Sequence, residues 1–180
     1  METAQERPIS QWMVIGLIVL GVVARWVPHP ANVSPLTALA LFGGAYLSRR
    51  WAIGLPLLAV VLSDLVIGLH ETVAFTWGAF ALAGLLGWWV RRQPSAKRIV
   101  LGSCAGSMLF FLVTNFGVWL LGHQGTMYPQ TLDGLVSCYA AALPFLRNTF
   151  AGDLMWTAGL FGLYALASAR GRAPRLAQAR

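Results

Sequence analysis

The chain alternates long apolar stretches with short polar, basic or proline-rich segments. The apolar stretches predict six membrane-spanning helices, at about 10–27, 35–47, 52–69, 73–90, 99–121 and 149–167. Most of them approach the ~20 residues that a helix needs to cross a hydrocarbon core of ~30 Å. The expected fold class is therefore all-α: a polytopic bundle of six transmembrane helices in a single membrane domain, residues 1–180, with a basic tail at 168–180.

The second of these helices is expected to be short. Ser34 followed by Pro35 is a strong helix start, with a hydroxyl N-cap and a proline at the first helical position. The helix over 36–47 reaches only ~18 Å, so its start is expected to lie below the membrane surface. Irregular backbone at that depth persists only inside protein or beside a wet cavity, and interrupted helices of this kind often mark transporter binding sites.

A second irregular region connects the fifth and sixth spans. Its stretch 132–146 is only moderately apolar and, at about 15 residues, marginal for a span. We expect it to form a helix that lies across one face of the bundle as an outer connection. Gly102 and Gly106, at the start of the fifth span, have the small-residue spacing that permits close contact between helices.

The composition agrees with a membrane protein and suggests its orientation. The chain is 57% hydrophobic and 11% charged, with a mean hydropathy of +0.65. Its net charge of +7 would suit nucleic acid, but the basic residues fall between apolar runs, as the positive-inside rule describes, so we expect no nucleic-acid partner. With six spans and both termini cytoplasmic, eleven of the thirteen Lys and Arg residues lie on the cytoplasmic side. In one alternative, 36–47 is re-entrant and the N-terminus outside, and only Arg7 and Arg25 exchange sides.

Asp64 is the principal candidate for a functional residue. It lies within the apolar stretch 57–70, and an ionisable group inside a bilayer costs a few kcal/mol, so it marks a site by default. The alternative is a structural carboxylate that caps a neighbouring helix, for instance at Ser34. Asn148 and Asp153 also have a structural interpretation, as the N-cap and first-turn acid of the last helix.

The other polar candidates fall on the same, outer side as Asp64. Together they predict a half-submerged polar cup in the bundle. Its members are His29, Asn32, Ser34, His70, Asn115, Trp119, Tyr128, Asn148 and Asp153.

Little in the sequence indicates catalysis or a resident cofactor. The two cysteines, Cys104 and Cys138, are expected near opposite ends of the bundle, where they could not form a disulfide. No metal-ligand spacing links the three histidines, and the chain has no nucleophile–base pair, phosphate loop or HExxH pattern. We therefore expect neither an enzyme nor a cofactor.

Four stretches resemble a known bacterial family. They are PHPANVSPLTALALFGGAY (28–46), VLSDLVIGLH (61–70), TNFGVWLLG (114–122) and CYAAALPFLRNTFAGDL (138–154). The family consists of uncharacterised membrane transport proteins, and the resemblance covers about 10–167. This family is similar in pattern to the S-components of energy-coupling-factor vitamin transporters. S-components are six-helix proteins that bind vitamins on the outer side and work with a membrane coupling subunit and ATPases.

The resemblance implies a substrate-binding subunit for uptake of a small vitamin-like solute across the bacterial cytoplasmic (inner) membrane. The floor of its site would be Asp64 and the turn 32–34, its lid would be the connection 123–139, and the start of the short helix would favour an anionic group on the solute. Its walls would be Asn115, Trp119, Asn148 and Asp153. If the solute were cobalamin, an axial cobalt ligand would come from His29, His70, His123 or Cys138.

Two alternatives stay open at this point. S-components generally carry an Ala-x-x-x-Ala patch on the first helix, which docks the coupling subunit. This chain has Gly16, Gly21 and Ala24 at other spacings. The protein therefore either uses a coupling subunit with ATPases or acts alone. The other alternative is a non-transporting membrane scaffold that docks cytoplasmic partners through its basic inner rim. A scaffold would depend on the inner arginines, whereas a solute binder would depend on the outer polar cup.

Overall fold

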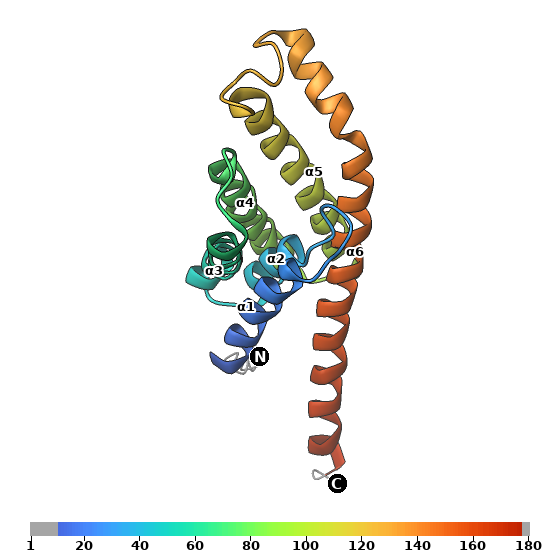
Figure 1. Ribbon diagram of the computed structural model, residues 1–180. Helices are drawn as coiled ribbons and strands as arrows, with labels where there is room; N and C mark the ends of the chain where they lie inside the picture. Colours follow the sequence, from blue (N-terminus) through green and yellow to red (C-terminus); the bar gives the residue numbers. More distant parts are fainter. Residues whose placement is uncertain (1–10, 178–180) are drawn as a thin grey trace.

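In the computed structural model, residues 11–177 are described, and within them every regular element is a helix (Figure 1). The helices are α1 (Gln11–Trp26), α2 (Leu36–Tyr46), α3 (Arg49–Ile67), α4 (Val73–Arg92), α5 (Ala96–Leu121) and α6 (Leu132–Ala177). Helices α3 to α6 are long and apolar enough to cross a membrane, while α1 and α2 are apolar but shorter. The all-helical prediction is confirmed, and the four long apolar helices are consistent with a membrane protein, while six crossings stay a prediction. The first five helices begin and end within a few residues of their predicted bounds.

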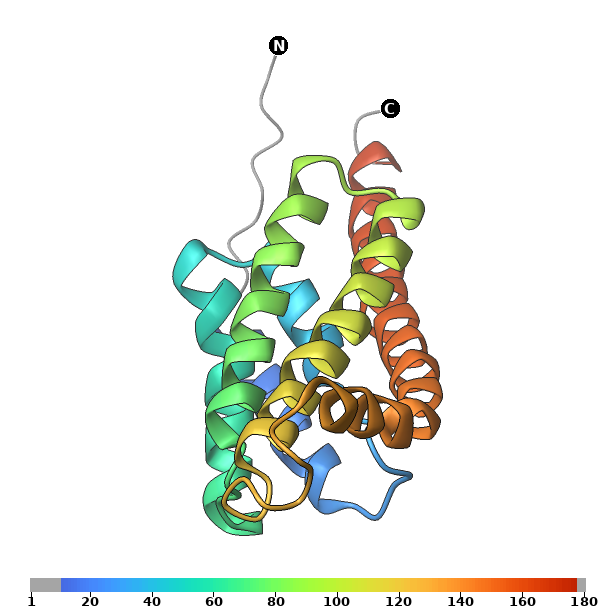
Figure 2. The ribbon, with the colours of Figure 1, turned by 90° about the horizontal axis from the view of Figure 1, so that it is seen from above.

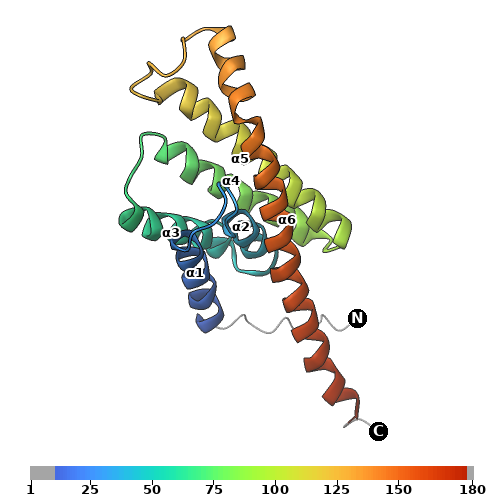
Figure 3. The same cartoon turned by 45° about the vertical axis from the view of Figure 1, so that its right-hand side comes forward.

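Helix α2 is the centre of the bundle. All residues from Leu36 to Ala45 are buried, and α2 contacts each of the other five helices. Figure 3, which looks nearly along α2, shows these helices arranged around it. At 1.5 Å per residue, its 11 residues extend about 17 Å, roughly half of a hydrocarbon core. The ends of α2 therefore lie inside the bundle, and the polar groups of the adjoining loops must find partners there.

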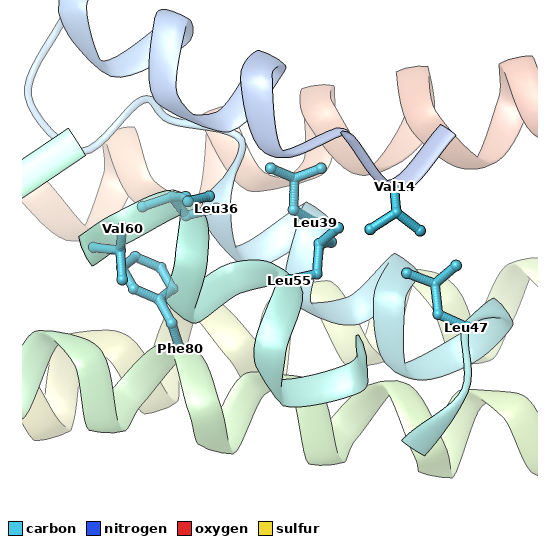
Figure 4. Close-up of a cluster of buried hydrophobic side chains, with 8 residues drawn as sticks. Val14, Leu36, Leu39, Leu47, Leu55, Val60 and Phe80 are labelled. Carbon is cyan, nitrogen blue, oxygen red and sulfur yellow. The ribbon is translucent and has the colours of Figure 1, made fainter. Parts of the chain in front are cut away.

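An aliphatic cluster packs α2 against α1, α3 and α4. Figure 4 shows Leu36 and Leu39 of α2 close to Val14, Leu55 and Phe80, which come from the three surrounding helices. A second cluster is aromatic and joins α2 to α6. It consists of Phe42, Tyr46, Phe161 and Tyr164, with ring centroids between 4.4 and 5.5 Å apart.

Glycines allow α2 and its neighbours to approach closely. A Cβ atom added at Gly87 of α4 would lie 2.5 Å from the carbonyl oxygen of Leu41 and 2.6 Å from the Cα of Gly44. Gly102 and Gly106 of α5 also face α2, where added Cβ atoms would meet the side chains of Leu41 and Thr37. The predicted role of the Gly102–Gly106 spacing in close helix contact is consistent with this packing.

The connection before the last span differs from its prediction. Residues 132–146 do not form a separate helix; they are the first part of α6, which runs unbroken for 46 residues. Figure 2 shows, however, that the orange first part of α6 runs at an angle to its red remainder. Pro144 lies within this helix and removes one backbone hydrogen bond, which favours bending. Proline therefore bends the chain here without ending the helix.

The glycine contact gives a direct test of the packing around α2. Gly87→Ala should lower the free energy of unfolding by about 1–3 kcal/mol, because the new methyl group meets backbone atoms that cannot rotate away. Gly78→Ala, on the same helix with nothing within 4 Å of the added Cβ, is the matched control and should leave stability unchanged or slightly raised. Chemical denaturation in detergent measures both, and equal stabilities of the two variants would contradict the described contact.

Candidate functional site: a polar pocket beside the start of α2

The loop between α1 and α2 packs against α6 and forms one wall of a pocket. Gly152 of α6 makes room for it, since a Cβ added there would lie 2.9 Å from the Cα of Val33. Asn32 adopts a left-handed backbone conformation (φ 64°), which asparagine tolerates better than most residues. The loop is thus held in a defined shape, with the side chains of Asn32 and Ser34 at the pocket.

The pocket extends from this loop to a buried carboxyl group and has a volume of about 130 Å³. His29 and Asn32 in the loop are exposed, whereas Asp153 of α6 is only 2% exposed. The loop therefore forms the mouth of the pocket and Asp153 its inner end. The lining residues are Arg25, His29, Asn32, Ser34, Leu36, Thr37, Thr76, Phe80, Phe110, Thr149 and Asp153.

An ion pair between α1 and α3 fixes the arginine of the pocket. Nη1 of Arg25 lies 2.6 Å from Oδ1 of Asp64 and also donates to the hydroxyl group of Ser63. The indole N–H of Trp77 donates to Oδ2 of Asp64 at 2.8 Å. The side chain of Asp64 is only 1% exposed, and a charge buried in this way requires hydrogen-bond donors. Both of its carboxylate oxygens have one.

The ion pair engages only one nitrogen of Arg25, which is itself a lining residue of the pocket. Every hydrogen bond that this group makes with the described residues comes from Nη1. Guanidinium carries five N–H donors in a planar fork, a geometry that suits carboxylate and phosphate groups. Arg25 is therefore a cation held in place by Asp64, and it has N–H donors beyond those on Nη1.

Asp153 lies at one end of a row of hydroxyl groups between α5 and α6. The hydroxyl oxygen of Ser107 lies 2.6 Å from Oδ2 of Asp153, and the side chain of Thr37 interacts with the same carboxyl group. One turn further along both helices, the hydroxyl group of Thr157 donates to that of Ser103 at 3.1 Å. Among the side chains that the structure describes, no basic residue forms an ion pair with Asp153.

The structure brings part of the predicted site together. His29, Asn32, Ser34 and Asp153 line the pocket. The other predicted residues lie outside its lining: Asp64, His70, Asn115, Trp119, Tyr128 and Asn148. Binding of a solute by any of them stays a prediction.

Three predicted roles need correction. Asp64 does not form the floor of the pocket but lies behind Arg25, whose charge it neutralises. Ser34 makes no capping hydrogen bond, because α2 begins after Pro35 and the serine side chain faces the pocket instead. Asn148 and Asp153 are neither N-cap nor first-turn acid, since α6 begins at Leu132.

The predicted lid does not line the pocket either. Side chains near the connection 123–139 are engaged locally: Asn115 donates to the carbonyl oxygen of Phe111 on its own helix, and the indole N–H of Trp119 donates to the carbonyl oxygen of Pro129. The α5–α6 hairpin instead extends away from α2 (Figure 1). The length of α5 explains the difference, because Leu121 lies 11 residues, or about 17 Å, beyond the pocket residue Phe110.

Several lining residues were not among the predicted site residues. They are Arg25, Leu36, Thr37, Thr76, Phe80, Phe110 and Thr149. Arg25 had a usable signal, because an arginine in the last turn of an apolar helix needs a buried partner, and Asp64 was the available carboxylate. The threonines gave no such signal, since a hydroxyl group in an apolar helix can satisfy itself on its own backbone.

Comparison with known proteins gives one match. Residues 5–176 match the sequence profile of a family described as a family of unknown function (DUF6580). No curated protein matches the chain. No solved structure matches it. The match agrees with the predicted membership of an uncharacterised family, and it supplies no link to energy-coupling-factor S-components.

The buried ion pair predicts a characteristic pattern of stabilities. Asp64→Asn should lower the free energy of unfolding by about 3–5 kcal/mol, because it leaves the partly buried Arg25 charge without its partner. The double variant Arg25→Met/Asp64→Leu removes both charges and should be more stable than either single variant. Denaturation of the wild type, Arg25→Met, Asp64→Leu and Arg25→Met/Asp64→Leu in detergent forms a double-mutant cycle, and additive effects would show that the two side chains do not interact.

Proposed function

The chain belongs to the DUF6580 family, and we propose that it is a membrane transport protein that binds a small anionic solute in the pocket between Arg25 and Asp153. The observation that carries this proposal is the position of Arg25, which forms a buried ion pair with Asp64 through Nη1 and is at the same time a lining residue of the cavity. A cation kept in place by a buried partner is already oriented for an anion, so little side-chain entropy is lost on binding.

The start of α2 adds to the attraction for an anion. Leu36 and Thr37, in its first turn, line the pocket, and Pro35 makes no side-chain cap. The unpaired N–H groups of a helix start carry a partial positive charge. Arg25 and this helix end therefore act on the same cavity, in agreement with the anionic group expected from the sequence.

The volume of the cavity favours a small solute. About 130 Å³ is less than the ~300–1,000 Å³ typical of sites for drug-sized ligands. Cobalamin is far larger, and of its four candidate cobalt ligands (His29, His70, His123 and Cys138) only His29 lines the pocket. We therefore favour a compact carboxylate, with Phe80 and Phe110 providing an apolar wall. A vitamin such as nicotinate, with one carboxylate on one ring, has this chemistry.

The proposed setting is the bacterial cytoplasmic membrane, with the pocket facing outward. The pocket lies near the end of α1, the end of α3 and the start of α4, and the basic segments 49–50, 91–92 and 97–98 lie at the opposite ends of their helices. The positive-inside rule then places both termini in the cytoplasm. This arrangement is compatible with two modes of transport. The protein could work with a coupling subunit and ATPases, as the S-components that the sequence resembles do, or it could act as a solitary carrier.

The scaffold alternative is less well supported by the basic end of the bundle. Arg91 donates to the carbonyl oxygen of Leu47, and the guanidinium group of Arg98 stacks on Trp89 with 5.1 Å to the ring centroid. These cations stabilise helix ends within the molecule. We therefore assign function to the pocket.

Binding of nicotinate, with nicotinamide as its uncharged counterpart, tests the proposal. The purified protein should bind nicotinate in preference to nicotinamide in isothermal titration calorimetry. In Arg25→Gln/Asp64→Asn, which removes both charges without leaving either one unpaired, affinity for nicotinate should fall by roughly 10- to 100-fold, the loss expected for one charge-assisted hydrogen bond. Affinity for nicotinamide should hardly change.

Asp133→Asn is the control, because Asp133 is an exposed carboxylate in the first turn of α6. It should bind nicotinate like the wild type. If the double variant kept the full preference for nicotinate over nicotinamide, Arg25 would not recognise the anion. If the wild type bound neither compound, nor acetate or benzoate, a small carboxylate would be the wrong solute class.

A further inference from the structure

The two buried carboxyl groups near the pocket have opposite surroundings. Asp64 has an arginine and an indole N–H as donors, so its negative charge is balanced. Asp153 has hydroxyl groups as neighbours and, within the described part of the chain, no ion-pair partner. An unbalanced charge at a site that is 2% exposed is costly, whereas a protonated carboxyl group is not. This contrast separates a carboxyl group with a cationic partner from one that has only hydroxyl partners.

The hydrogen bonds of Ser107 allow two states. Its hydroxyl oxygen lies 2.6 Å from Oδ2 of Asp153 and 3.1 Å from the carbonyl oxygen of Ser103. A serine hydroxyl carries a single proton and cannot donate to both. When Asp153 is ionised, Ser107 donates to the carboxylate. When Asp153 is protonated, it donates to Ser107, whose own proton then turns to the Ser103 carbonyl. In both states Oδ2 of Asp153 and the hydroxyl oxygen of Ser107 stay hydrogen-bonded to each other, without any movement of the backbone.

The other ionisable groups around Asp153 are few and identifiable. Arg25 and His29 line the same pocket, and Arg25 is already paired with Asp64. Helix α2 brings no acidic or basic residue, and those of α5, Lys97 and Arg98, lie at the far end of that helix. With His29 neutral, the pocket and its supporting carboxylate therefore carry one net negative charge while Asp153 is ionised, and none once it is protonated.

We infer that Asp153 is a proton-binding site of the pocket and that a solute anion binds there together with one proton. A proton from water at the mouth converts the carboxylate to the acid, and this removes the negative charge that would repel the incoming anion. By linkage, the bound anion in turn holds the proton. The inference rests on the proposed function for the identity of the anion, but not for the existence of the proton site.

Infrared spectroscopy tests the proton site without any solute. Spectra of the purified protein at acid and alkaline pH should differ by the C=O stretching band of a protonated carboxyl group in an apolar setting. Asp153→Asn should lack this band, and Asp133→Asn should retain it. Ser107→Ala should retain the band at a shifted frequency, because the acid loses its acceptor. Identical pH-difference spectra for the wild type and Asp153→Asn would overturn the inference.

Nicotinate binding as a function of pH tests the coupling. Above the pH at which the infrared band disappears, the affinity of the wild type should fall about tenfold per pH unit, the slope for one linked proton. Asp153→Asn should be flat over this range, and His29→Gln should keep the slope. A flat wild-type profile, or a slope lost only in His29→Gln, would overturn the coupling. If the wild type bound no nicotinate at all, the proposed function would fail, while the infrared measurement would still decide whether Asp153 takes up a proton.

Discussion

The burial of a helix too short to cross the membrane determines the rest of this structure. Helix α2 contacts all five other helices and extends about 17 Å, so its buried start lies within the bundle, next to the loop that precedes it. Exposed backbone at such a depth must be satisfied by protein or by a wet cavity. The packing of the loop on Gly152 and the polar pocket beside Ser34 fulfil these two requirements, and the pocket is thus a consequence of the fold.

Much of the fold follows from the sequence because each helix that crosses a membrane needs a long apolar run. Apolar length, with proline and basic residues between the runs, located the first five helices within a few residues. The unbroken α6 was missed because 132–146 is only moderately apolar and too short for a span, so hydropathy separated it from 149–167. The long projection of α5 beyond the pocket was missed for a related reason: hydropathy gives the length of a helix but not its position along the bundle.

The site was predicted less completely, since depth and sidedness do not determine which side chains meet. His29, Asn32, Ser34 and Asp153 were found because polar residues at the outer ends of helices are few. Asp64 was predicted to be a buried carboxylate, and it is buried. The free-energy cost of burying a charge, however, does not distinguish a carboxylate that binds a solute from one that pairs with another side chain, as Asp64 does with Arg25. Pairing it with Arg25 required knowing that α1 and α3 are adjacent, a fact that comes from tertiary packing.

The stability of the fold does not by itself explain why these charges are present. A buried ion pair is often no more stabilising than apolar side chains of similar size, and a buried carboxyl group without a cation is a net cost. Asp64 balances the charge of Arg25 and fixes its guanidinium group, so the pair is neutral overall but already oriented. Asp153 has no ion-pair partner among the described residues, which is why we infer that it takes up a proton. If a single proton decides whether an anion is attracted, as we infer, solute capture accounts for these buried charges better than packing does.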